Sequence, residues 1–157
     1  MHAVAYRSTG IGEIELIRPL WKQLNEYHHT KASHFKTHYE RMTFEHRRLY
    51  FCKLHESGQL RVDLAMDTTT GMYVGYCVSS LSAEKTGEVE SLFVDAAYRS
   101  AGIGTALVIR GLTWMDSQGA IRKRVSVGNG NEAVWAFYRK FGFYPRMTLL
   151  EQKTDCE

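Results

Sequence analysis

Residues 88–105 constrain the fold of this chain more than any other stretch. Val89, Leu92 and Val94 are typical of a buried strand, and the turn Arg99-Ser100-Ala101-Gly102-Ile103-Gly104 leads from it into an apolar pattern with helical spacing. The first amides of a helix have no partners within the helix, and the helix dipole favours negative charge there. Glycine lets the backbone approach a phosphate closely. The stretch therefore predicts a strand, an anion-binding turn and a helix in succession.

The first third of the chain predicts a strand and two helical regions. The strand is expected over 3–8, and in the helix that follows Pro19 should cause a kink or a restart, because proline lacks a backbone donor. The second helical region is predicted over 37–57. There Thr37-His38-Tyr39-Glu40 has the spacing of a capping box, and Gly58 is a suitable C-terminal stop.

The rest of the chain predicts alternating strands and helices. Strands are expected at 60–67, 72–81, 88–95 and 121–127, helices at 102–117 and 131–141, and a final strand at 144–151. The order is β-α-α-β-β-β-α-β-α-β. No linker, repeat or low-complexity tract divides it. We therefore expect one α/β (α+β) domain over 1–157, with a mixed sheet and helices on both faces.

Composition narrows the functional class. The net charge of +3 permits an anionic ligand but does not require a nucleic-acid partner. No apolar run approaches the ~20 residues that span a bilayer, and the first residues lack the pattern of a secretory signal. Cys52, Cys77 and Cys156 are an odd, scattered set that suits a reducing compartment. We expect a cytoplasmic protein with no membrane or nucleic-acid partner.

Two other phosphate-binding motifs disagree with the spacing of the turn. A dinucleotide fingerprint needs a third glycine three positions after Gly104, where this chain has Leu107. A P-loop ends in Gly-Lys-Ser/Thr, which the turn lacks.

The strand, turn and helix resemble the acetyl-CoA pyrophosphate motif of the GNAT superfamily of N-acetyltransferases. A second segment, from Asn131 to Phe143, is similar to the family's Asn-x-x-Ala-x-x-x-Tyr-x-Lys-x-Gly-Phe pattern. Two departures occur: Ser100 and Ala101 stand where many relatives have Gly and another polar or basic residue, and Ala96-Ala97 replaces a common Pro-containing turn. The resemblance implies a GNAT-like, mostly antiparallel mixed sheet and acetyl-CoA as cosubstrate.

The resemblance also implies the cofactor site. Main-chain groups of the strand would face the pantetheine arm and the acetyl carbonyl, amides of the turn would hold the pyrophosphate, and Asn131 would bind the pantetheine arm. The implied cofactor-binding residues are Leu92, Phe93, Val94, Arg99, Ser100, Ala101, Gly102, Ile103, Gly104, Thr105, Asn131 and Tyr138. Arg122-Lys123-Arg124 is either a solvated edge or a contact for the 3′-phosphate of CoA.

Two residues are candidates for proton transfer. By resemblance Tyr138 is the general acid that protonates the leaving thiolate, and its ordinary pKa near ~10 keeps it protonated. The alternative is a half-buried aromatic with a packing role. Glu90 is a candidate base or a binding group for the acceptor amine, and a chain of waters is a further alternative. Strand alternation is expected to place Glu88, Glu90, Leu92 and Val94 on one face.

Acceptor-side residues are expected where the first two helical regions meet. Tyr27 and His28 are candidates for acceptor binding, and a histidine is also a candidate base. His34 and His38 have i,i+4 spacing, but no third ligand supports zinc, so no metal is expected. Cys52 and His55 are read as helix packing rather than as a nucleophilic pair.

The sequence therefore predicts an acetyl-CoA-dependent N-acetyltransferase. The acceptor is a primary amine of a small molecule or protein, which attacks directly in a ternary complex. The alternative is a catalytically inactive domain that binds acyl-CoA. A homodimer is possible, by analogy with the family.

Overall fold

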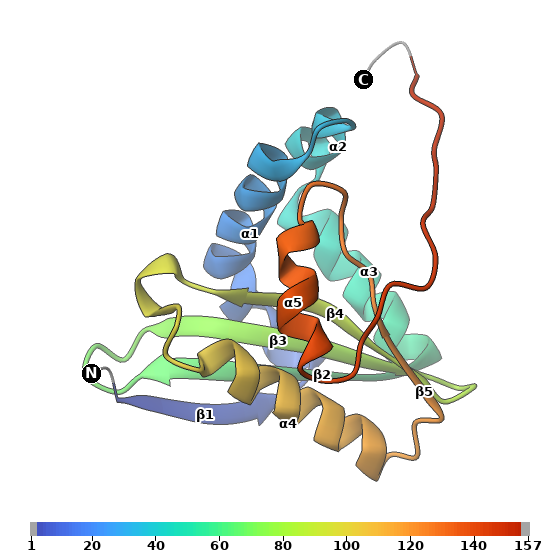
Figure 1. The fold of residues 1–157 in the computed structure, drawn as a ribbon. Coiled ribbons are helices and arrows are strands. Elements are labelled where there is room, and N and C mark those ends of the chain that lie inside the picture. Colours follow the sequence, from blue (N-terminus) through green and yellow to red (C-terminus); the bar gives the residue numbers. More distant parts are fainter. Residues whose placement is uncertain (1–2, 155–157) are drawn as a thin grey trace.

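A five-stranded sheet forms the centre of the molecule, and the computed structural model describes residues 3–154 (Figure 1). The strands lie in the order β1-β2-β3-β4-β5. Strands β1 to β4 are antiparallel to their neighbours, and β5 runs parallel to β4, so the predicted mixed, mostly antiparallel sheet is confirmed. The strand bounds are β1 Val4–Thr9, β2 Gly58–Asp67, β3 Tyr73–Ser82, β4 Thr86–Val94 and β5 Arg122–Val125.

Helices cover both faces of the sheet, as predicted. In Figure 1, α4 lies against one face, and α1 and α3 lie behind the other. The α-helices are α1 Arg18–Lys31, α2 Lys36–Arg41, α3 Phe44–Ser57, α4 Ile103–Ser117 and α5 Trp135–Arg139. Three short 3-10 segments are η1 Ile11–Ile17, η2 Ala96–Tyr98 and η3 Glu132–Val134. Among residues 3–154, no helix has both the length and the apolar character needed to cross a membrane.

Each face of the sheet has its own hydrophobic core. The core beneath α1 and α3 contains Trp21, Phe51, Val62, Tyr76 and Phe93, among others. The core beneath α4 contains Cys77, Val89, Ile103, Leu107 and Met115, among others. Side chains of β3 alternate between the two cores, since successive residues of a strand point to opposite faces.

The helical region after α1 differs from the prediction. It is divided into α2 and α3 by Met42 and Thr43, which have extended backbone. The capping box therefore forms at Thr43, whose hydroxyl accepts from the His46 amide, and not at Thr37. Thr37 lies inside α2, and its buried hydroxyl has no hydrogen-bond partner among the described residues. The predicted restart at Pro19 is confirmed, because α1 begins at Arg18 with the proline in its first turn.

The prediction of a final strand at 144–151 is wrong, because this segment does not join the sheet of the described chain. Residues 144–154 have no regular structure and no strand partner within the described chain. The chain leaves α5 through Gly142, which has a φ of 82°, and runs away from the sheet as an extended segment (Figure 1). The alternation of side chains predicts the extended backbone correctly. It does not show whether a neighbouring strand lies close enough to pair with the segment.

Candidate functional site

The sheet opens between β4 and β5. Their parallel pairing ends at Val89 and Val125, where β5 stops, while β4 continues to Val94. The edge of β4 that faces β5 is therefore unpaired over residues 90–94. Among residues 3–154 no strand pairs with this edge, although the Arg47 and Arg99 side chains donate to the Glu90 and Val94 carbonyls. An extended ligand could therefore pair with the backbone between them. The predicted residues Leu92, Phe93 and Val94 all lie along this edge.

A β-bulge at Glu90 lies at the start of the opening. Val78 pairs with Ser91 and Ser79 pairs with Val89, which leaves Glu90 as the extra residue of β4. Glu90 consequently shares a face with Ser91, toward α3, whereas Leu92 packs in the core beneath α4. The predicted single face for Glu88, Glu90, Leu92 and Val94 is therefore wrong, because the bulge breaks the alternation.

The predicted anion-binding turn connects β4 to α4. Gly102 precedes the first turn of α4 with a φ of 78°, so the amides of Ile103, Gly104 and Thr105 begin the helix without partners within it. Ser100 also has a positive φ, of 65°, which is uncommon for a residue with a side chain. A Cβ added at Gly104 would lie 3.6 Å from the Phe137 ring, so α4 and α5 meet at this turn.

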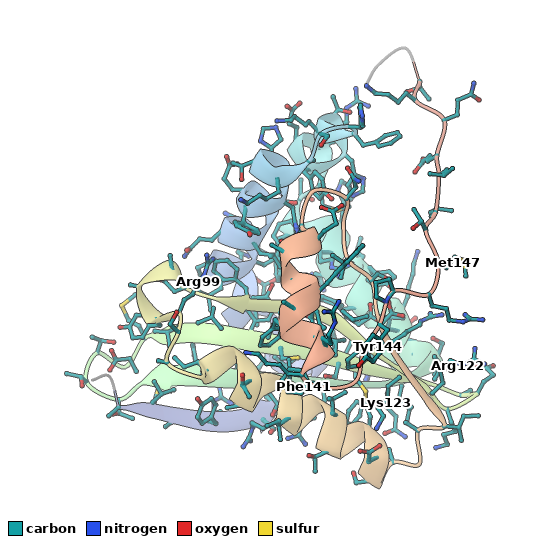
Figure 2. The ribbon with its side chains drawn as sticks, in the orientation of Figure 1. Arg99, Arg122, Lys123, Phe141, Tyr144 and Met147 are labelled. Atoms are coloured by element: carbon teal, nitrogen blue, oxygen red, sulfur yellow. The ribbon has the colours of Figure 1, made fainter. Side chains whose placement is uncertain are left out.

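The side chain of Arg99 lies across the opening. Its Nε donates to the Val94 carbonyl at 3.1 Å, and its guanidinium is 5.5 Å from the ring centroids of both Tyr27 and Phe93. Figure 2 shows Arg99 between the end of β4 and the α1 side of the molecule. Arg99 therefore places a positive charge beside the end of β4, in the turn that leads to α4.

Two adjoining cavities occupy the α3 side of the opening. The larger has a volume of about 430 Å³ and the smaller about 360 Å³, and both are lined by Tyr50, Glu88 and Glu90. The larger cavity is also lined by Trp21, His28, His38, Tyr39, Arg47, Ser91, Leu92, Val125, Asn131 and Tyr138, among others. The smaller is also lined by Leu54, Ser57, Ser80, Leu81, Ser82, Glu84, Thr86 and Arg124. Glu90 therefore lies where the two cavities meet.

Both carboxylate oxygens of Glu90 accept hydrogen bonds. Ser80 donates to Oε1 at 2.5 Å, and the Tyr50 hydroxyl donates to Oε2 at 3.2 Å. Arg47 donates to the Glu90 carbonyl at 2.6 Å, which holds the bulge against α3. Burial raises the pKa of Glu90 above its ordinary value, and the hydrogen bond from Ser80 opposes part of this change. A carboxylate with a raised pKa is better suited to accept a proton.

Tyr138 and Asn131 lie on the opposite wall of the larger cavity. Tyr138 is only 7% exposed, and burial raises its pKa, so its hydroxyl stays protonated at neutral pH. The Asn131 amide oxygen accepts from the Tyr27 hydroxyl at 3.4 Å. At Gly130 an added Cβ would lie 1.9 Å from the Lys31 carbonyl, so only glycine lets this loop pack against the end of α1.

Of the two predicted acceptor-side residues, His28 lines the larger cavity. It stacks on Tyr39, with 5.7 Å between ring centroids. Burial, together with the charge of Arg47, lowers the pKa of His28, so the ring is uncharged at neutral pH. Tyr27 does not line this cavity; its side chain contacts Asn131 and Arg99.

Sequence reasoning missed three residues that hold Glu90 in place. Arg47 and Tyr50 come from α3, three positions apart and therefore on one helix face, and Ser80 comes from β3. The spacing of Arg47 and Tyr50 was a signal that both side chains lie on one face of α3. No motif connects them to Glu90, because three separate elements meet only in the folded sheet.

The remaining sequence candidates lie at the margins of the site. His38 lines the larger cavity, whereas His34 is exposed, and among residues 3–154 no three metal-ligating side chains form a group. Lys123 pairs with Asp116, and Arg124 donates to Glu88 at 2.6 Å. Two of the three β5 cations are therefore already engaged within the chain.

A mixed sheet that opens beside a bulge and is followed by an anion-binding turn agrees with the fold that the resemblance to the GNAT superfamily implies. The model of the acetyltransferase (GNAT) family matches residues 18–143, and the chain belongs to this family. Solved structures agree with this fold. A GCN5-related N-acetyltransferase from Ralstonia eutropha superposes with a TM-score of 0.75 at 16% identity, over 96% of this chain and 99% of that one. An aminoglycoside N-acetyltransferase in complex with CoA gives 0.68 at 16% identity, over 99% and 97%.

Curated relatives match over shorter stretches. An uncharacterised N-acetyltransferase of Methanocaldococcus jannaschii is 30% identical over 66 residues, which cover 42% of this chain and 29% of that protein. The mycothiol acetyltransferase of Mycolicibacterium gilvum is 34% identical over 85 residues, which cover 51% and 28%. The match thus spans less than a third of the length of either relative.

Proposed function

We propose that this chain transfers the acetyl group of acetyl-CoA to a primary amine of a small molecule or protein, by direct attack in a ternary complex. The observation that carries the proposal is the position of Glu90. Its carboxylate lies where the two cavities meet, beside the unpaired edge of β4 and on the same cavity as Tyr138. A thioester along that edge and an amine from the smaller cavity would meet at this carboxylate.

The cofactor would extend from the turn to the cavity. Amides of residues 100–105 and the charge of Arg99 would bind the pyrophosphate, as at other helix N-termini. Backbone groups of residues 92–94 and the amide of Asn131 would bind the pantetheine arm. Asn131 would exchange its bond from Tyr27 for one to the cofactor. Neighbouring structures that contain CoA or a CoA-based bisubstrate analogue support this cosubstrate.

The proposed proton path uses two groups of opposite function. Glu90 would accept a proton from the amine, directly or through water, while the amine nitrogen bonds to the acetyl carbon. The carbon–sulfur bond then breaks, and the Tyr138 hydroxyl donates a proton to the leaving thiolate, giving free CoA thiol. The uncharged His28 ring on the same cavity is the alternative base.

We also propose a cytoplasmic location and a homodimer. Cys52 and Cys77 are unbridged thiols, which supports a reducing compartment.

The experiment that tests the function combines binding with turnover. Calorimetric titration of acetyl-CoA into the wild-type protein should give micromolar affinity, and a panel of amines should then release free CoA thiol. Gly102→Asp should abolish binding, since it adds bulk and negative charge at the turn and forces a positive φ on a residue with a Cβ. Wild-type affinity in this variant would remove the turn from the cofactor site. Binding without turnover on any amine would contradict the transferase proposal.

A further inference from the structure

The side chain of Arg47 places a positive charge in the wall of the larger cavity. The residue is half-buried on α3, and its guanidinium carbon lies 4.9 Å from the ring centroid of Tyr50 and 4.7 Å from that of Phe51. Its hydrogen bond to the Glu90 carbonyl uses one nitrogen. A guanidinium has five N–H donors, and among residues 3–154 this one makes no other hydrogen bond. Most of its donors are therefore unused.

Arg47 also lacks the carboxylate partner that similar arginines have. The other half-buried arginines of the described chain each pair with an Asp or Glu side chain: Arg18, Arg48, Arg61 and Arg110. Burial removes water from a charge, and a paired carboxylate offsets part of that cost. Because Arg47 forms no salt bridge among residues 3–154, its charge is available to an anion that enters the cavity.

The hydrogen bond from Arg47 also sets the distance between this cation and the proposed base. The guanidinium contacts the main chain of Glu90, and the base is the side chain of the same residue. Their separation is therefore limited by the length of one glutamate side chain. Tyr50 contacts both groups, since its ring lies beside the guanidinium and its hydroxyl donates to the Glu90 carboxylate at 3.2 Å. A ligand that reaches both groups needs an amine and an anion only a few bonds apart.

The surrounding charges favour the larger cavity as the place for this anion. Within the smaller cavity a carboxylate would meet Glu84 and the ion pair of Glu88 with Arg124. In the described lining of the larger cavity, Arg47 is the only lysine or arginine. The phosphates of CoA would bind at the turn after Val94, at the other end of the opening. The anion at Arg47 would therefore belong to the acceptor and not to the cofactor.

Given the proposed acetyl transfer, on which this inference rests, we propose that Arg47 binds the carboxylate of the acceptor, and that the acceptor is an α- or β-amino acid. The planar fork of N–H groups on an arginine matches the two oxygens of a carboxylate. Glu90 would receive the amine at the junction of the two cavities, while the carboxylate lies on the larger-cavity side. The product would be an N-acetylated amino acid that keeps its contact with Arg47.

Paired substrates test the carboxylate site. Wild-type protein is assayed with acetyl-CoA and a panel of amino acids that includes glycine and β-alanine, each beside its carboxamide. For the preferred amino acid, kcat/KM should be at least ~10-fold higher than for its amide, the usual effect of a hydrogen bond to a charged group. The amide has the less basic amine and more of the reactive free form at neutral pH. A preference for the acid must therefore come from binding.

Variants of Arg47 and its neighbour assign this preference to one side chain. Arg47→Gln should remove the preference, and Arg47→Lys should keep part of it, because lysine retains the charge and loses the fork. If Arg47 only supports the bulge, acid and amide lose activity together and their ratio does not change. Arg48→Gln is the matched control: Arg48 is the next residue of α3, is also half-buried, and pairs with Glu45. It should keep the wild-type ratio, and circular dichroism checks that each variant is folded.

A binding measurement separates failure of the carboxylate site from failure of acetyl transfer. The same acids and amides are titrated into the CoA-bound protein, and the side-chain ¹⁵N resonance of Arg47 is followed by NMR. The acids alone should shift it. Equal kcat/KM for acids and amides, or a preference that survives Arg47→Gln, would overturn the carboxylate site and leave acetyl transfer in place. Absence of turnover with any amine would contradict acetyl transfer. The titration then decides the carboxylate site: a shift with the acids supports it, and no shift overturns it.

Discussion

The two faces of the sheet differ in how completely they are filled. Beneath α4 the contacts are close: a Cβ at Gly111 would lie 2.5 Å from the Ser79 hydroxyl, and one at Gly87 would lie 2.6 Å from the Met115 sulfur. Beneath α1 and α3 the core contains Phe51 and Tyr76, but it gives way to two cavities beyond Glu90. The face beneath α4 is therefore fully packed and is called the closed face. The face beneath α1 and α3 contains the cavities and is called the open face.

The polar groups of the two faces follow the same division. On the closed face Asp63 is fully buried and is paired with Arg61 at 2.8 Å and Arg110 at 3.0 Å, with a further bond from Ser8 at 2.7 Å. On the open face the Glu90 carboxylate accepts from two hydroxyl groups, and no salt bridge to it forms among residues 3–154; Arg47 donates to its main-chain carbonyl. A carboxylate paired with two arginines stays ionised, whereas one held by hydroxyl groups alone can take up a proton. The comparison predicts that mutations will separate effects on stability from effects on activity.

The largest effect is expected from Tyr138→Phe. Removal of the hydroxyl should lower kcat by ~10²–10⁴-fold, the usual value of a general acid, with acetyl-CoA affinity nearly unchanged. Steady-state kinetics with calorimetry would measure both quantities. Thermal unfolding should change little, since the ring keeps its contacts with Phe137 and Phe143. A kcat within about twofold of wild type would leave Tyr138 a packing role only.

Glu90→Gln should move activity and stability in opposite directions. Burial raises the pKa of Glu90 in the folded protein, so the folded state binds this proton more tightly than the unfolded chain. That stabilisation is present at low pH and is lost as the pH rises through the folded pKa. The variant should therefore be at least as stable as wild type at pH 8, with a much lower kcat.

The pH profile of the wild-type enzyme gives an independent check on Glu90. The acid limb of kcat/KM should lie above 4.5, the ordinary pKa of a glutamate, and Glu90→Gln should remove it. His28→Asn is the matched comparison, because the pKa of His28 is lowered instead. If the limb disappears in the His28 variant and not in the Glu90 variant, the base is the histidine.

Asp63→Ala should reduce stability and leave the chemistry unchanged. The change leaves Arg61 and Arg110 without their shared carboxylate and should lower the free energy of unfolding by about 3 kcal/mol, at the low end for a broken buried pair because both arginines are partly solvated. Urea unfolding measures this loss, and kcat at a temperature where the variant is folded should match wild type. A large change in kcat would contradict the division between the faces.

The smallest effect is expected from Ser100→Gly. The serine has a φ of 65°, which glycine adopts without strain, so the substitution should raise the free energy of unfolding by up to ~1 kcal/mol. Acetyl-CoA affinity should stay within a few-fold of wild type, because the amide remains in place. Gly102→Ser makes the opposite change at a neighbouring position with a φ of 78° and should destabilise the turn.

Local patterns in the sequence predict the fold well where one element supplies all of the signal. The strand and helix around the turn and the restart at Pro19 are of this kind. The bulge at Glu90 was not predictable, because it exists only in the register between β3 and β4. The break at Met42 was missed because Thr37 has the capping-box spacing with Glu40, whereas the box that forms pairs Thr43 with His46 instead of the usual Glu or Gln. The strand predicted at 144–151 was not predictable as unpaired, because local alternation does not show whether a segment reaches a strand edge.

The short helix α2 has a consequence for how such a protein can diverge. None of its six residues is buried, yet His38 and Tyr39 line the larger cavity. Substitutions there cost little of the folding free energy, because surface changes usually remain within ~0.5 kcal/mol. A lineage can therefore reshape the wall of the larger cavity through α2 while the turn between β4 and α4 stays as it is. The cavity wall and the turn lie on separate parts of the chain and can evolve at different rates.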